Sequence, residues 1–213
     1  MLLQRLINRS RLAAGLLSLF VVASCASSGP TRVAGPIAAG GAGAPGGSAA
    51  TSPAIPAAAQ TLFEQATAVM AAGDFLDAEL RFKEFVLLYP DYPGAHVNLA
   101  IIHARNEDDV ATRAALDAAL ALNPDHPAAL NQLGMLLRKN GNFLEAEAAY
   151  LKAVTVSPEY ALAHYNLGVL NELYLQRLDV ALQHFEIYQE LVGNDNQVEK
   201  WIADLKRRVA ARQ

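Results

Sequence analysis

The sequence contains a single cysteine among 213 residues, so no disulfide can form within the chain. It has 17 Lys and Arg against 21 Asp and Glu, which leaves no excess of positive charge. Nucleic-acid binding normally needs such an excess, so we expect no nucleic-acid partner. The apolar run at residues 12–22 is about half of the roughly 20 residues that a membrane-spanning helix needs. A permanent membrane helix is therefore disfavoured, although an uncleaved anchor remains an alternative.

Motifs of enzyme active sites are also missing. The chain has no Gly-rich phosphate loop, no nucleophile-elbow serine and no His-Glu-x-x-His sequence. His96 and His103 lie seven residues apart, whereas a helical metal pair more often uses a spacing of three to five, and no nearby carboxylate or cysteine completes a ligand set. We therefore predict a protein that is not an enzyme, with no cofactor, no metal and no small-molecule substrate, and we expect these histidines to serve packing.

The first 24 residues have the pattern of an export signal. Arg5, Arg9 and Arg11 are their only charges, and the apolar run follows. Removing these three positive charges would change the formal net charge from −4 to −7.

The apolar run leads into Val22-Ala23-Ser24-Cys25, which resembles the lipobox of bacterial lipoproteins. The resemblance implies that Cys25 is lipidated and becomes the first residue of the mature protein, anchored in a membrane. The alternative is an incidental cysteine in an ordinary signal peptide. Ala26 follows the cysteine, and the sorting rule of enterobacterial lipoproteins then implies the periplasmic face of the outer membrane.

Residues 25–58 form a candidate tether between this anchor and the rest of the chain. After Cys25 they are almost all Ala, Gly, Ser, Pro and Thr, without apolar periodicity. Such a composition predicts a flexible linker, whose root-mean-square span would be roughly 30 Å.

A 34-residue period organises the remaining sequence. Pro90, Pro124 and Pro158 are spaced by that period, and a small residue recurs at the eighth place of each window (Ala66, Ala100, Gly134 and Gly168). Each window divides into two helical patterns, at 59–72 and 75–89 in the first, and the prolines end the second helices. Small residues at the eighth and twentieth places would let the two helices approach closely. A period of 34 with this pattern is typical of helix-turn-helix repeats that stack into a solenoid.

The segments Tyr165-Asn166-Leu167-Gly168 and Gly141-Asn142-Phe143-Leu144-Glu145-Ala146 resemble tetratricopeptide repeats. The resemblance implies an all-α solenoid over residues 59–195 with about four repeats, at 59–92, 93–126, 127–160 and 161–195. The second repeat has Glu107-Asp108-Asp109 where a Gly-Asp-aromatic turn is usual, and the fourth holds one extra residue near 174–177.

Residues 196–213 predict a final amphipathic helix that caps the solenoid. Its apolar face comprises Val198, Trp201, Ile202, Leu205 and Val209. A helix lying on a membrane surface is the alternative, which the basic cluster at 206–208 favours.

The resemblance also implies a peptide-binding groove lined by the first helix of each repeat. Carried over by position, its candidate residues are Phe63, Thr67, Met70, Val97, Ile101, Arg105, Asn131, Met135, Arg138, Lys139, Tyr165, Val169 and Glu172. Any one of them could instead pack against the next repeat. The fifth places hold Phe63, Val97, Asn131 and Tyr165, which do not reproduce the clamp that related cochaperones use for a C-terminal carboxylate.

These features together predict a lipid-anchored periplasmic adaptor that binds a protein of the cell envelope. The chain resembles the repeat lipoproteins of pilus and secretin assembly, among them pilotins and the Tad-pilus lipoprotein. It also resembles NlpI-like lipoproteins, which would make it a recruiter of peptidoglycan hydrolases or proteases. A weaker alternative is an accessory subunit of an enzyme.

Overall fold

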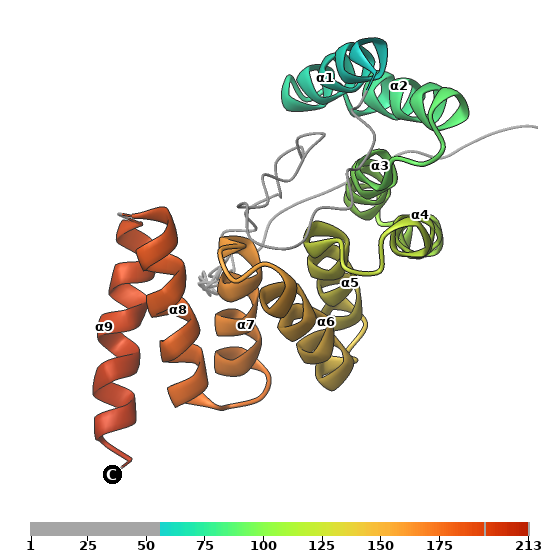
Figure 1. Cartoon of the computed structure of the whole chain (residues 1–213). Helices are drawn as coiled ribbons and strands as arrows, with labels where there is room; N and C mark the ends of the chain where they lie inside the picture. The colour runs from blue at the N-terminus through green and yellow to red at the C-terminus, as the bar shows by residue number, and fades with distance from the viewer. Residues whose placement is uncertain (1–55, 194, 213) are drawn as a thin grey trace, which may run out of the picture. The chain divides into compact units, whose positions relative to one another are not determined.

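A computed structural model describes residues 56–193 and 195–212 of the chain. These residues form nine α-helices that pack pairwise (Figure 1), so the predicted all-α fold is confirmed. The helices are α1 (Ala57–Ala71), α2 (Phe75–Leu88), α3 (Pro93–Arg105), α4 (Asp109–Leu122), α5 (Pro127–Lys139), α6 (Phe143–Val156), α7 (Ala161–Leu173), α8 (Leu178–Val192) and α9 (Asn196–Ala210).

The turn between the two helices of a repeat needs one residue in the left-handed backbone region. Gly73 and Gly141 supply it with φ of 89° and 80°, because glycine has no Cβ to oppose that conformation. In the second repeat Glu107 occupies the same place with φ of 59°. The irregular sequence of this repeat therefore keeps the turn, at the cost of backbone strain in a residue with a side chain.

Prolines separate one repeat from the next, as predicted. α4 and α6 each end two residues before Pro124 and Pro158, since a proline disfavours helical backbone in the residue before it. The capping N–H of Asn123 donates to the carbonyl of Ala119, and that of Ser157 to Ala153. Each helix thus ends with its last turn hydrogen-bonded.

Within a repeat, a glycine on the first helix lies directly against an aromatic ring on the second. A Cβ added to Gly134 would lie 2.5 Å from the Tyr150 ring, and one added to Gly168 would lie 2.7 Å from the Phe185 ring. Both rings are fully buried. The absence of a side chain is therefore what lets α5 approach α6 and α7 approach α8.

The extra residue of the fourth repeat lies in the connection between α7 and α8. That connection covers residues 174–177, whereas α5 and α6 are joined by residues 140–142. Relative to the third repeat, every position after this connection is shifted by one residue. Ala181 and Phe185 therefore take the buried positions that Ala146 and Tyr150 hold in the third repeat. The helices themselves keep their packing because the connection absorbs the insertion.

Neighbouring repeats are held together by polar contacts as well as by apolar packing. Lys152 on α6 donates from Nζ to the carbonyl of Pro124 over 2.7 Å and pairs with Asp125 over 3.0 Å. At the ends of the helices, Lys139 contacts Asp109, and Arg177 pairs with Glu147 over 2.8 Å. Residues about thirty positions apart are thereby joined across the junction of the second and third repeats and that of the third and fourth.

The last helix, α9, packs against α8 and takes the position of a first helix of another repeat. Asp195 caps its N-terminus by accepting from the N–H groups of Gln197 and Val198. Val198 and Leu205 are buried, while Glu199 and Lys200 are exposed. A polar outer face ends the stack, in agreement with the predicted capping helix. No helix within 56–193 or 195–212 is long and apolar enough to cross a membrane.

Candidate functional site

Most candidate groove residues of the first two repeats are buried. Phe63 packs edge-on against Phe82 and Phe85, with ring centroids 5.6 and 5.4 Å apart. Five of the thirteen candidates, from the first three repeats, are less than 5% exposed: Phe63, Met70, Val97, Ile101 and Asn131. In the described structure these side chains serve packing, which is the alternative that the sequence left open for each of them.

The candidates of the fourth repeat are covered by α9. Tyr165 contacts Trp201 with ring centroids 6.1 Å apart, and Val169 packs in the same apolar cluster. Arg208 of α9 donates to Glu172 over 2.6 Å. The capping helix thus occupies the surface where the sequence placed this part of the groove, because it lies where a further repeat would stack.

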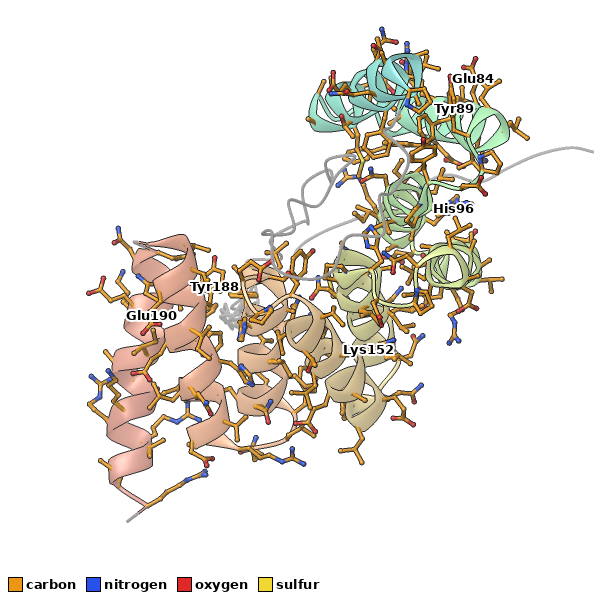
Figure 2. All side chains as sticks on the ribbon, in the orientation of Figure 1. Glu84, Tyr89, His96, Lys152, Tyr188 and Glu190 are labelled. Carbon is orange, nitrogen blue, oxygen red and sulfur yellow. The ribbon has the colours of Figure 1, made fainter. Side chains whose placement is uncertain are left out.

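Figure 2 shows the side chains of α7, α8 and α9 as sticks, with Tyr188 labelled on α8. The Tyr188 ring lies 5.3 Å from Tyr165, and its hydroxyl is 3.2 Å from Asp195 Oδ2. Tyr165 is therefore part of an aromatic core shared by α7, α8 and α9.

The accessible candidates lie mainly on α3 and α5, two helices in contact. Met135 and Arg138 are half-buried, and Arg105 and Lys139 are exposed. The remaining candidate, Thr67 on α1, is half-buried. The Arg105 guanidinium lies 4.1 Å from the centre of the Phe75 ring, and Lys139 contacts Asp109. The structure therefore brings a cationic and apolar surface together at the C-terminal ends of α3 and α5.

Arg138 differs from its neighbours because it makes no ion pair with any residue that the structure describes. Its Nη1 is buried and has no hydrogen-bond partner, and the same holds for the hydroxyl of Tyr150 on α6. Burial raises the pKa of Tyr150, with the positive charge of Arg138 acting in the opposite direction. The phenol therefore stays protonated at neutral pH.

Two histidines form the other polar cluster of the fourth repeat. His164 Nδ1 lies 3.1 Å from His184 Nδ1, and His164 Nε2 lies 3.0 Å from the Pro158 carbonyl. Since a carbonyl only accepts, His164 Nε2 carries a proton and its neutral ring accepts from His184 through Nδ1. Burial, followed by the neighbouring His164, lowers the pKa of His184 to about 4. His164 is buried, whereas His96 and His103 are half-buried. The described residues contain no group of three or more side chains that could hold a metal ion.

The tetratricopeptide repeat family model matches residues 63–127, 111–155 and 131–196. Together these matches run from 63 to 196, more than half of the 213 residues. The chain belongs to the tetratricopeptide repeat family.

Solved tetratricopeptide repeat structures share this fold at low sequence identity. PilF of Pseudomonas aeruginosa is 22% identical with a TM-score of 0.65, and the match covers 72% of this chain and 70% of PilF. MamA of Desulfovibrio magneticus RS-1 is 19% identical with a TM-score of 0.57, covering 71% and 85% of the two chains. A thermophilic repeat protein of Thermus thermophilus is 21% identical with a TM-score of 0.59, covering 69% and 80%. A search among curated proteins found no significant match.

The buried hydroxyl of Tyr150 is a feature of this tetratricopeptide repeat chain that sequence reasoning missed. Its place in the repeat predicts a buried aromatic residue, and most such residues only fill space. The signal in the sequence is the choice of tyrosine over phenylalanine, since a buried hydroxyl normally requires a partner. Phe82 and Phe185 hold the same place in other repeats without a hydroxyl.

Proposed function

We propose that this chain is a non-catalytic scaffold of the cell envelope that holds another protein through the surface formed by α3 and α5. Tetratricopeptide repeats are scaffolds for protein–protein interaction, and proteins built from them are generally not catalytic. The location of the binding surface is supported by the cationic and apolar surface at the ends of α3 and α5. It contains accessible candidate residues, whereas most other candidates are used for packing.

The proposed anchor is Cys25, which lies outside the described residues together with the signal peptide and the tether. Its support is the order of a basic segment, a short apolar run and a cysteine in the sequence. The proposed cellular location is the periplasmic face of the outer membrane. The tether would let the repeats bind a partner at a distance from the bilayer.

A role in pilus or secretion-system assembly is the finer proposal. Its support is the similarity in fold to PilF together with the lipobox-like sequence. At 22% identity the similarity concerns the fold, so the partner has to be identified by experiment.

The anchor is tested with Cys25→Ser in the full chain. We expect loss of palmitate labelling and release from the membrane fraction, with Ser24→Ala as the matched control that keeps both. Unchanged labelling and fractionation of Cys25→Ser would refute the lipid anchor.

The binding surface is tested by crosslinking and pull-down from native membranes with Arg138→Glu. Arg207→Glu is the control, because Arg207 carries the same charge on the polar side of α9 and is exposed. We expect Arg138→Glu to lose partners that the parent and Arg207→Glu retain. Equal recovery with all three proteins would place the binding surface elsewhere.

A further inference from the structure

We infer that the outer face of α2 pairs with α2 of a second copy of this chain, with the two helices antiparallel. The apolar residues of the contact are Leu76, Leu80 and Leu87, the leucine stripe. The candidate groove residues all lie on other helices. The inference therefore goes beyond the proposed function and does not depend on it.

The leucine stripe lies on the side of α2 that faces away from the neighbouring helices. Leu76, Leu80 and Leu87 are 73%, 60% and 83% exposed, whereas Phe82 and Phe85 on the opposite side are buried. Steps of four and seven residues keep the three leucines in one narrow band of the helix surface. The stripe is thus an apolar surface that the described residues leave uncovered.

The fold does not need leucine in the second and third positions of the stripe. Both positions are exposed in all four repeats, yet the later repeats place only small or polar residues there. The equivalent residues are Ala114, Ala148 and Gln183 for Leu80, and Ala121, Thr155 and Glu190 for Leu87. Packing within the described chain therefore does not account for these two leucines.

The spacing of the stripe is that of a helix that pairs with another helix. Together with Lys83, the stripe follows the steps of four, three and four residues between the a and d positions of a coiled coil. Lys83 is exposed and pairs with Glu79, one turn earlier, over 2.6 Å. A parallel pair of copies would place the two Lys83 ammonium groups opposite each other, which disfavours that orientation.

Antiparallel pairing makes this face of α2 complementary to itself. It sets Leu76 against Leu87 of the second copy, and it brings Lys83 beside Glu79 of that copy. The two-fold axis repeats both contacts. Apolar side chains then meet apolar side chains, and each ammonium group faces a carboxylate from the other helix.

The charges beside the stripe disfavour a lipid surface as its ligand. Glu79 and Glu84 flank the stripe on its two sides, and Glu84 is labelled in Figure 2. The cations of α2, Arg81 and Lys83, are paired with Asp77 and Glu79. A helix that lies on a membrane instead has Lys and Arg along its polar side.

The expected association is weak because the contact is short. α2 has 14 residues, about 21 Å of helix at 1.5 Å per residue. Two such helices bury less than the roughly 1,200–2,000 Å² of a standard interface, so we expect a Kd on the order of 10–100 μM. A dimer would present two copies of any partner-binding surface, which increases avidity for a multimeric partner.

Oxidative crosslinking tests the antiparallel register. Cys25→Ser in the full chain makes an introduced cysteine the only thiol. We expect a disulfide-linked dimer when chains with Leu76→Cys are mixed with chains with Leu87→Cys. Either chain alone should give little, because about 16 Å of helix then separates the two thiols. Equal crosslinking of each chain with itself, or none in the mixture, would overturn the inference.

Sedimentation equilibrium of the full chain measures the strength of the association. We expect Leu80→Glu to raise the Kd at least tenfold, and circular dichroism should show that it still folds, because Leu80 is exposed. Val110→Glu is the matched control, since Val110 is an exposed apolar residue of α4, and it should leave the Kd unchanged. A parent that stays monomeric up to about 1 mM, or equal effects of the two variants, would overturn the dimer.

Charge reversal separates a contact between copies from the ion pair within α2. Lys83→Glu and Glu79→Lys should each raise the Kd about tenfold, because each brings like charges together across the pair. An equimolar mixture of the two variants should associate as tightly as the parent, since each chain supplies the charge that the other lacks. Mixing changes no contact within a helix. A mixture that associates as weakly as each variant alone would refute the register.

A different occupant of the stripe would give a different set of results. If the parent is monomeric and Leu80→Glu loses a protein in pull-down, or loses binding to lipid vesicles, the stripe belongs to that ligand and self-association is overturned.

Discussion

Asn166 donates from its side-chain Nδ2 to Oδ1 of Asn131 over 2.9 Å, and the two amides join α7 to α5 across the junction of the third and fourth repeats. Both residues are less than 10% exposed. A buried polar pair of this kind fixes the register of one repeat on the next, because any other register would leave amide groups without partners.

Replacing one asparagine of this pair should lower the unfolding free energy more than replacing both. Asn131→Ala leaves the Asn166 amide buried and unpaired, so we expect a loss of about 1–3 kcal/mol in unfolding free energy, measured by urea denaturation. The double change to leucine should recover part of that loss. Equal destabilisation by Asn131→Ala and by Asn140→Ala, in an exposed turn position, would show that the hydrogen bond contributes little.

The close contact between Gly134 and Tyr150 predicts how substitutions of glycines in helices change the stability of the protein. Gly134→Ala places a Cβ 2.5 Å from the Tyr150 ring, and we expect destabilisation by about 1–3 kcal/mol in thermal or urea unfolding. Gly134→Leu should unfold the array. Gly94→Ala is the control, because its Cβ would lie at an ordinary 3.4 Å from Phe63. A Gly134→Ala protein as stable as Gly94→Ala would contradict this packing.

Replacing the strained turn residue of the second repeat should make the protein more stable. Glu107→Gly relieves the φ of 59°, and we expect a gain of about 0.5–1 kcal/mol after the greater freedom of glycine in the unfolded chain is counted. Gly141→Ala, in the equivalent turn with φ of 80°, should lose a similar amount. Both are measured by the midpoint of urea unfolding, and a Glu107→Gly protein less stable than the parent would refute the strain.

The histidine pair predicts a loss of stability in acid. The pKa of His184 is lowered from 6.5 to about 4 in the folded protein, so the unfolded chain takes up a proton more readily between these values. Stability is therefore fully present above pH 6.5 and falls as the pH is lowered towards 4. The melting temperature of His184→Gln should fall less than that of the parent over this range. Equal slopes for the two proteins would show that His184 does not contribute.

Most of the fold could be predicted because the same sequence signals recur in four repeats. The prolines, the small residues at the eighth place and the glycine turns each give a local signal, and the structure places the helices where those signals predict them. The extra residue near 174–177 could also be recognised in the sequence, because the apolar positions that follow it are all shifted by one residue. Repetition turned weak local preferences into a consistent pattern.

The candidate groove was harder to predict. Position in the repeat assigned the same role to Val97, Asn131 and Tyr165, yet one lies in the apolar core, one pairs with Asn166 and one packs under α9. Exposure depends on what each neighbouring helix places against a residue, and those contacts involve residues 35 or 36 positions away. A single position in the sequence does not carry that information.

The sequence by itself determined the class of protein, the number of helix pairs and, within two residues, the bounds of the two helices in the first repeat. These properties follow from local backbone preferences and from the 34-residue apolar pattern. Only the tertiary structure decided that α9 covers Tyr165 and Glu172, and that Arg138 Nη1 and the Tyr150 hydroxyl find no hydrogen-bond partner among residues 56–193 and 195–212. The reason is physical: burial and hydrogen bonding of a side chain are settled by the helices that pack around it, and in a stack of repeats those helices come from the neighbouring units.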